Sequence, residues 1–184
     1  MSGVAIVNQL MFIFYLCVFG AMAGAGIFTA QFFGSGNHEG IRQTFRFKFL
    51  AGILLGFAGI ALLYGFGTPL IRLYLKSGSD PDAAALTLQY GLDYLHMMLW
   101  GLVPFALANA YASTLRDTGK TLVPMVASVT AVLVNLGLNY VLIFGHFGAP
   151  AMGVKGAALA TVISRYVELA IVMIGSHCNK KFHF

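Results

Sequence analysis

Ionic side chains are scarce in this sequence. Of its 184 residues only 9% are Asp, Glu, Lys or Arg, whereas 59% are hydrophobic, and ordinary soluble domains carry about a quarter charged residues. A soluble domain of this length cannot hide so much apolar surface behind so few charges, because its surface-to-volume ratio limits burial. The composition therefore excludes a soluble fold and predicts that a lipid bilayer surrounds most of the chain.

Other functional classes lack the residues they need. Of the 11 Lys and Arg residues, all but Arg165 are divided among the predicted loops. This distribution is typical of charges that set membrane topology beside anionic headgroups, and it predicts no nucleic-acid partner. There is no phosphate-binding loop, HExxH helix or nucleophile elbow, so we expect neither an enzyme nor a cofactor. His177, Cys178 and His183 lack metal-ligand spacing, and we expect no metal site. Cys17 and Cys178 predict no disulfide framework.

Charge-free stretches locate the membrane spans, because an unpaired ion in hydrocarbon is costly and a helix needs ~20 apolar residues to cross. We predict helices near 5–33, 49–71, 94–115, 121–145 and 154–176. These stretches are too long for barrel strands and lack their two-residue alternation. The expected fold class is all-α, a polytopic transmembrane bundle of about five spans that forms a single unit over 1–184.

The orientation follows from the basic residues of the loops, which stay on the cytoplasmic side during insertion. The first, third and last loops contain Arg42, Arg46, Lys48, Arg116, Lys120, Lys180 and Lys181, and the alternate loops contain Arg72, Lys76 and Lys155. This asymmetry predicts a multi-pass protein with a cytoplasmic C-terminus and the first residue outside. Because 1–38 has no basic flank or signal-peptide pattern, we expect that an upstream helix is missing and that the chain is an internal fragment.

Small residues in the first span favour close helix packing. Gly20 and Gly24 are four apart, and such rows let two helix backbones approach closely in lipid. Gln31 follows this row and is either an internal hydrogen-bonding group or a group at headgroup level.

The fifth span contains the only predicted intramembrane charges. Gly156, Ala160, Ser164 and Glu168 are spaced by four and share one helix face, on which the small residues are expected to pack. Arg165 precedes Glu168 by three positions, close enough for an ion pair. The pair is either part of a proton or ion pathway or a structural ion pair, and the sequence leaves both open.

Two further spans contain candidate residues. Asn135 and Asn139 share one face of the fourth span, where amides bind ligands or cations, or join helices by hydrogen bonds. Gly101 and Pro104 interrupt the third span, because proline removes an intrahelical hydrogen bond. The resulting kink is either a hinge or fixed curvature.

The order of four motifs resembles the multidrug and toxic compound extrusion (MATE) family. "AQFFGSG" at 30–36 is similar to the end of the family's second helix, and "LRDTGKTLVPM" at 115–125 to the link between its fourth and fifth helices. "VNLGLNYVLIFG" followed by "GAPAMGVKGAALATVISRYVE" resembles its fifth and sixth helices with the short loop between them. The resemblance covers nearly the whole chain.

The resemblance implies that the five spans are helices two to six of a twelve-helix fold with two lobes around a central cavity. It implies a bacterial plasma-membrane antiporter that exports organic, often cationic, compounds in exchange for H+ or Na+. Asn135, Asn139, Arg165 and Glu168 fall where the family places polar groups. Some members have Asp where Asn139 stands, so a protonatable group there is not supported. Without its remaining lobe, the chain is expected to be inactive.

Two alternatives remain open. One is a lipid-linked oligosaccharide flippase of the same superfamily, although few intramembrane cations are available here for a pyrophosphate. The other is a non-transporting membrane scaffold, which small-residue rows suit equally well. A scaffold would tolerate loss of the polar set Asn135, Asn139, Arg165 and Glu168, whereas a transporter would not.

Overall fold

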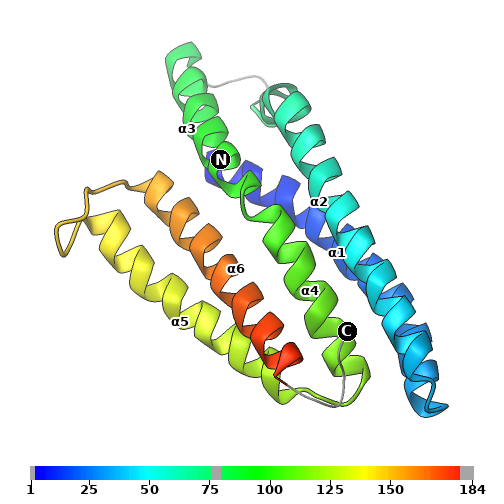
Figure 1. The fold of residues 1–184 in the computed structure, drawn as a ribbon. Coiled ribbons are helices and arrows are strands. Elements are labelled where there is room, and N and C mark those ends of the chain that lie inside the picture. The colour runs from blue at the N-terminus through cyan, green and yellow to red at the C-terminus, as the bar shows by residue number, and fades with distance from the viewer. Residues whose placement is uncertain (1–2, 76–79, 179–184) are drawn as a thin grey trace.

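The computed structural model describes residues 3–75 and 80–178. It contains six helices and, within these residues, no strand, which confirms the all-α prediction (Figure 1). The helices are α1 (Gly3–Gly34), α2 (His38–Tyr74), α3 (Pro81–Leu99), α4 (Leu102–Asp117), α5 (Leu122–Phe144) and α6 (Val154–His177). Lys76, Lys180, Lys181 and His183 lie outside the described residues, so the predicted orientation stays a prediction.

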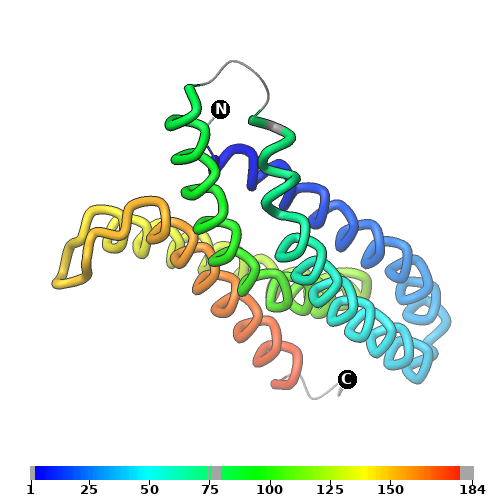
Figure 2. Tube along the Cα trace, turned by 90° about the horizontal axis from the view of Figure 1, so that it is seen from above, coloured from blue at the N-terminus to red at the C-terminus, as the bar shows by residue number. Residues whose placement is uncertain are grey.

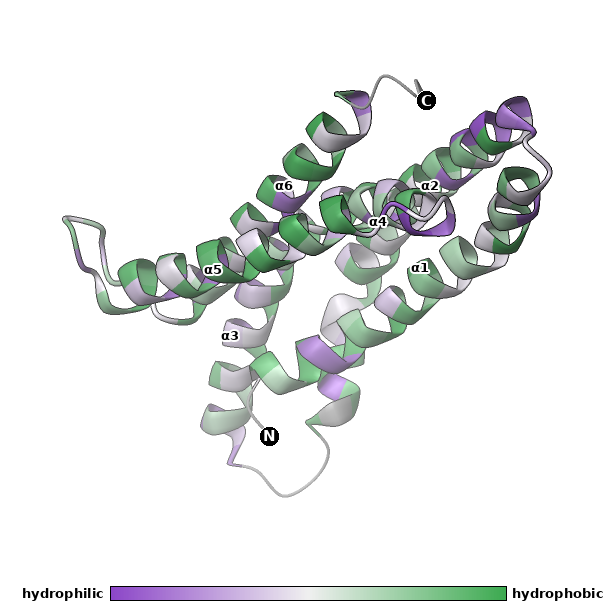
Figure 3. Ribbon diagram, turned by 90° about the horizontal axis from the view of Figure 1, so that it is seen from below, coloured by the Kyte–Doolittle hydropathy of each residue, from purple (hydrophilic) through white to green (hydrophobic). Residues whose placement is uncertain are grey.

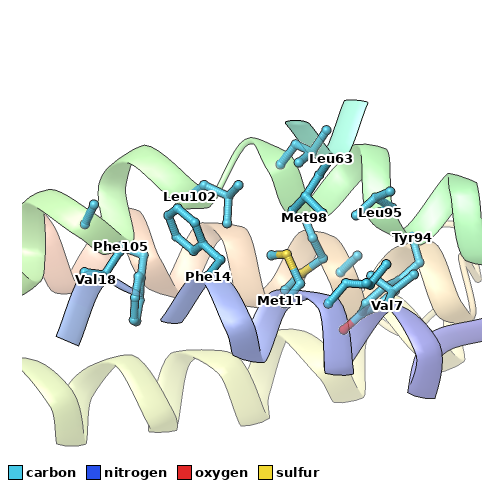
Figure 4. Packing of buried hydrophobic residues seen from close by; sticks show 14 of the residues in the cluster. Val7, Met11, Phe14, Val18, Leu63, Tyr94, Leu95, Met98, Leu102 and Phe105 are labelled. Carbon is cyan, nitrogen blue, oxygen red and sulfur yellow. The ribbon is translucent and has the colours of Figure 1, made fainter. Parts of the chain in front are cut away.

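The main core lies where α1, α2, α3 and α4 meet. Residues three or four apart on α1, such as Val7, Met11 and Phe14, are buried against Met98 of α3 and other apolar side chains (Figure 4). The opposite face of α1 is apolar too, and Phe12 is 59% exposed there. A helix that is hydrophobic all round meets protein on one side and lipid on the other. Figure 3 shows this hydrophobic covering, with hydrophilic residues gathered at the α1–α2 turn.

The helix expected near 49–71 begins eleven residues earlier, at His38. Asn37 caps it by accepting a hydrogen bond from the Gly40 amide at 3.0 Å. A charge-free run shows which part of a helix lies in hydrocarbon, but it does not show where the helix begins. The prediction that Arg42, Arg46 and Lys48 lie in a loop is therefore wrong, because all three belong to α2. Among them, Lys48 is fully buried; its Nζ donates to Asp117 Oδ2 at 2.7 Å and to Ser113 Oγ at 2.9 Å. Lys48 is thus a structural ion-pair partner between α2 and α4.

The helix expected at 94–115 is two helices, α3 and α4, which are bent by 44° at Trp100–Gly101 (Figure 2). Pro104 lies in the first turn of α4 and has no N–H to donate to the Trp100 carbonyl, the usual i−4 partner. Tyr166 of α6 supplies the missing donor, its hydroxyl lying 3.2 Å from that carbonyl oxygen. The predicted interruption at Gly101 and Pro104 is therefore present, and Tyr166 of α6 donates a hydrogen bond to the Trp100 carbonyl that the interruption leaves free.

Helices α5 and α6 form an antiparallel hairpin beside α4 (Figure 1). Gly145 ends α5 in the left-handed region at φ 73°, which glycine adopts without strain. A Cβ at Gly156 would lie 2.7 Å from the Leu142 carbonyl oxygen, so this glycine allows α6 to approach the α5 backbone. Ala160 and Ser164 on the same row are buried.

The row of Gly20 and Gly24 packs against no helix in the described part of the chain. A Cβ at either position would meet no atom within 4 Å. Both glycines line an outward-facing groove between α1 and α2. A close helix contact at this row stays a prediction for a neighbour other than the described helices. The tight glycines of α1 are instead Gly3, where a Cβ would lie 2.5 Å from the Thr87 carbonyl oxygen, and Gly26, where it would lie 2.9 Å from Asp117 Oδ2.

Length and composition make four helices able to cross a membrane: α1, α2 as far as Leu73, α5 and α6. The bent pair of α3 and α4 counts as a fifth span if it crosses as one unit. The chain is therefore a multi-pass membrane protein, with four or five candidate spans within residues 3–75 and 80–178.

We expect Asp117→Asn to lower the free energy of unfolding by about 3 kcal/mol, because it leaves the buried Lys48 ammonium without a counter-charge. The double variant Lys48→Met with Asp117→Asn should recover most of this loss, since it removes both charges. Thermal unfolding of the purified protein in detergent measures the effect. Glu39→Gln is the matched control, because the Glu39–Arg42 pair is exposed at 3.5 Å and contributes under about 0.5 kcal/mol. Equal losses for Asp117→Asn and Glu39→Gln would contradict the structural role.

A double-mutant cycle tests the link between Tyr166 and Pro104. Tyr166→Phe should cost about 1 kcal/mol of unfolding free energy in the parent protein, because the Trp100 carbonyl loses its donor in a nonaqueous setting. In a Pro104→Ala background the same change should cost almost nothing, since the backbone amide of the introduced alanine can donate to that carbonyl. Strictly additive losses, read from the same unfolding curves, would show that the hydroxyl and the proline act independently.

Candidate functional site

A cavity of about 300 Å³ lies where α1, α4, α5 and α6 meet. Its lining combines aromatic, small and charged side chains: Tyr15, Phe19, Phe105, Ala108, Asn109, Ala112, Arg116, Ser128, Arg165 and Glu168. It is thus the cavity that contains the predicted charged pair of α6. Charged groups beside an opening inside a membrane bundle are candidates for ligand or ion binding.

Both carboxylate oxygens of Glu168 have partners in the cavity wall. Arg165 donates from one terminal nitrogen to Oε2 at 3.2 Å, and the Ser128 hydroxyl of α5 donates to Oε1 at 3.1 Å. The Arg165–Glu168 ion pair predicted from the three-residue spacing is therefore formed. It leaves the two side chains 30% and 17% exposed, so the pair remains accessible from the cavity.

Aromatic rings hold the Arg165 guanidinium. Its central carbon lies 4.8 Å from the ring centroid of Phe105, which is a cation–π distance. The Phe105 ring also packs at 4.4 Å from the ring of Tyr15, and Tyr15 interacts electrostatically with Arg165. The Arg165 Nε atom is buried and has no hydrogen-bond partner among the described residues. Arg165 thus retains a donor beyond those used in its ion pair.

Asn135 and Asn139 belong to a separate chain of hydrogen bonds between α5 and α6. The Asn139 amide nitrogen donates to Asn135 Oδ1 at 3.0 Å, and the Asn135 amide nitrogen donates to Thr161 Oγ1 at 3.2 Å. The Thr161 hydroxyl in turn donates to the Ala157 carbonyl at 3.0 Å. Asn139 Oδ1 is buried and accepts no hydrogen bond from the described residues. Neither asparagine lines the 300 Å³ cavity.

The remaining predicted residues do not join this cavity. Gln31 is exposed near the end of α1. Gly101 and Pro104 lie at the α3–α4 break, just before Phe105, and shape the cavity only through the direction of α4. A role for Gln31 in a pathway, and hinge motion at Gly101 and Pro104, stay predictions.

Sequence reasoning missed several residues of the site. Nothing in the sequence marks Ser128 or Phe105 as a site residue. Ser128 is a single hydroxyl residue outside any spacing pattern, and Phe105 is one of 16 phenylalanines. Arg116 was assigned to a loop as a topology charge, yet it is in the last turn of α4 and lines the cavity. Its position one turn beyond Ala112 on a small-residue face was the available signal.

Comparison of the sequence with known proteins shows the family of the chain. The family model described as MatE matches residues 1–141. The chain belongs to the MATE family. Its MATE relatives include a "Probable multidrug resistance protein NorM" of Thermotoga maritima, 32% identical over 94% of this chain and 36% of the relative. The "Probable multidrug resistance protein YoeA" of Bacillus subtilis is 27% identical over 99% of this chain and 38% of the relative.

A third MATE relative is the "Multidrug resistance protein MdtK" of Photorhabdus laumondii, which is 29% identical over 94% of this chain and 36% of its own length. The chain therefore spans a little over a third of the length of the curated relatives it matches. Membership confirms the resemblance drawn from the motifs at 30–36, 115–125 and the α5–α6 segment, and it assigns the chain to a transport family.

Proposed function

We propose that the complete reading frame containing this chain encodes a MATE-type antiporter, which exports small organic compounds in exchange for protons or sodium ions. The 184 residues form one incomplete lobe of it, corresponding to helices two to six, and do not transport on their own. The names of the relatives support multidrug export. The observation that carries the proposal is the Arg165–Glu168 pair, which faces a cavity from inside a membrane-spanning helix.

Glu168 is suited to the exchange of a substrate for a coupling ion, because its carboxylate can bind one cation after another. In hydrocarbon, where ions are poorly solvated, a carboxylate keeps its charge only while a cation is close. Arg165 is that cation at 3.2 Å in this structure. A proton, a sodium ion or the cationic centre of a substrate arriving at Glu168 would compete with Arg165 and with one another. The coupling ion and the substrate therefore cannot occupy Glu168 at the same time, and this mutual exclusion is what antiport requires.

Glu168→Gln should reduce resistance to exported compounds at least about fourfold, because the amide has no charge with which to bind competing cations. The measurement is the minimal inhibitory concentration of ethidium in an efflux-deficient bacterium that expresses the complete reading frame. Membrane insertion should be unchanged, since Gln keeps the size of Glu and can accept the Ser128 hydrogen bond.

The matched control is Glu39→Gln, the same chemical change at an exposed position in the first turn of α2. It should leave resistance at the parent level. Unchanged export by Glu168→Gln, with the parent's pH and sodium dependence, would remove Glu168 from the mechanism. Resistance that is absent even in the parent protein would favour the membrane scaffold.

A further inference from the structure

A separate pocket of about 270 Å³ lies between α2 and the end of α3. It shares no lining residue with the cavity that contains Glu168. Its lining combines two aliphatic side chains with three that carry a polar group: Ile60, Tyr64, His96, Leu99 and Trp100.

Two close helix contacts bracket this pocket. A Cβ at Gly67 of α2 would lie 2.6 Å from Leu95 Cδ2 of α3, and a Cβ at Gly56 would lie 2.9 Å from Val103 Cγ2 of α4. The lining residues fall between these two contacts along both segments of the chain. Because the chain bends by 44° between α3 and α4, it leaves α2 there and returns to it. The course of the backbone therefore produces the opening.

The Lys155–Asp93 ion pair indicates where the membrane surface lies. Lys155 Nζ is 3.2 Å from Asp93 Oδ2, and the two side chains are 52% and 35% exposed, as suits ions among water and headgroups. At 1.5 Å per residue, His96 lies at most about 4.5 Å deeper than Asp93 along α3, and Trp100 at most about 10 Å deeper. A headgroup layer is about 5–7 Å thick. The pocket thus extends from the level of the lipid phosphates into hydrocarbon.

The polar groups of the pocket are hydrogen-bond donors without an acceptor. The Tyr64 hydroxyl, the His96 ring and the Trp100 indole N–H donate to no other group in the described part of the chain. The rings of Tyr64 and His96 lie with their centroids 5.3 Å apart, so two of the donors are neighbours. The described residues of the lining include no carboxylate, which leaves a cation without a counter-charge. Since hydrocarbon accepts no hydrogen bonds, these donors suit an anionic group with several oxygens.

The apolar part of the lining lies deeper in the membrane than the Tyr64–His96 pair. Helices α2 and α3 run antiparallel here. Ile60 precedes Tyr64 by one turn of α2, and Leu99 follows His96 by about one turn of α3. Both aliphatic side chains are therefore on the hydrocarbon side. A ligand that fits has an anionic group near the membrane surface and an apolar chain below it.

We propose that this pocket binds the phosphodiester of a membrane phospholipid. Tyr64, His96 and Trp100 donate hydrogen bonds to the phosphate oxygens, and an acyl chain of the same lipid lies against Ile60 and Leu99. A free phosphate ion has the same oxygens, but it would leave water for a partly apolar wall that it cannot cover. The bound lipid joins α2 to α3 beside the helix break. This site is independent of the export function proposed for the Glu168 cavity.

Quenching of Trp100 fluorescence tests the proposal. Trp100 is the only tryptophan of the 184 residues, and subtracting the signal of a Trp100→Phe variant isolates it in the protein expressed from the complete reading frame. That protein is purified in detergent and titrated with phosphatidylglycerol brominated on its acyl chains, or with the diacylglycerol that has the same chains and no phosphate. We expect saturable quenching and at least about tenfold tighter binding of the phospholipid, because hydrogen bonds to a charged group are strong.

Removal of single donors should weaken binding of the phospholipid alone. Tyr64→Phe and His96→Leu are each expected to reduce its affinity about fivefold and to leave diacylglycerol binding unchanged, since each removes one donor and keeps a side chain of similar size. Tyr90→Phe is the matched control, because Tyr90 is an exposed tyrosine of α3 that does not line the pocket. It should alter neither affinity.

Several results would overturn the phospholipid site. Equal affinities for phospholipid and diacylglycerol would show that the donors play no part, and displacement of the phospholipid by inorganic phosphate would favour a soluble anion. Trp100 without saturable quenching would favour a pocket covered by another helix of the complete protein. An equal loss of affinity in Tyr90→Phe and Tyr64→Phe would also contradict the site. The antiporter is unaffected by these results, because the resistance assay decides it.

Discussion

Hydrocarbon cannot solvate ions, so each charged side chain at membrane depth needs a partner within the protein. Lys48 meets this constraint most fully: no part of its side chain reaches the surface, and it donates to Asp117 and Ser113. This places one polar cluster between α2 and α4, next to Gly26 of α1. The three helices can approach there because the glycine leaves room for the carboxylate. The close approach of α1, α2 and α4 at this point therefore depends on the Lys48–Asp117 ion pair and on the missing side chain of Gly26.

The same constraint links the helix break to the candidate site. Pro104 frees the Trp100 carbonyl, and a free carbonyl in a membrane needs a donor from another helix. Tyr166 provides it. Arg165 is the preceding residue on α6 and Phe105 is the residue that follows Pro104, so this hydrogen bond lies next to the cation–π contact of the guanidinium with the ring. It joins α6 to α4 at the helix break, beside the candidate site.

The sequence predicted the features that depend on composition and local spacing. Charge-free runs predicted α1 and α5 to within two residues, an otherwise apolar segment predicted α6, and the three-residue spacing predicted the Arg165–Glu168 pair. The start of α2 was not predictable in this way, because a helix continues past the membrane wherever its polar residues are solvated or paired. The partners of Lys48 and Glu168 were not predictable either, because Asp117 and Ser128 are distant in the chain and contact these residues only through tertiary packing.

The Lys48–Asp117 and Arg165–Glu168 ion pairs differ in a way that suits different roles. Lys48 and Asp117 come from separate helices and are 2.7 Å apart, so breaking their contact would separate α2 from α4 and leave a buried ammonium alone. Arg165 and Glu168 come from successive turns of one helix, and their contact joins no two helices. It can therefore open and close without moving the backbone. The pair also borders a cavity and is partly exposed to it, whereas the Lys48 side chain is fully buried, so of the two pairs it is the one that suits the binding role proposed for Glu168.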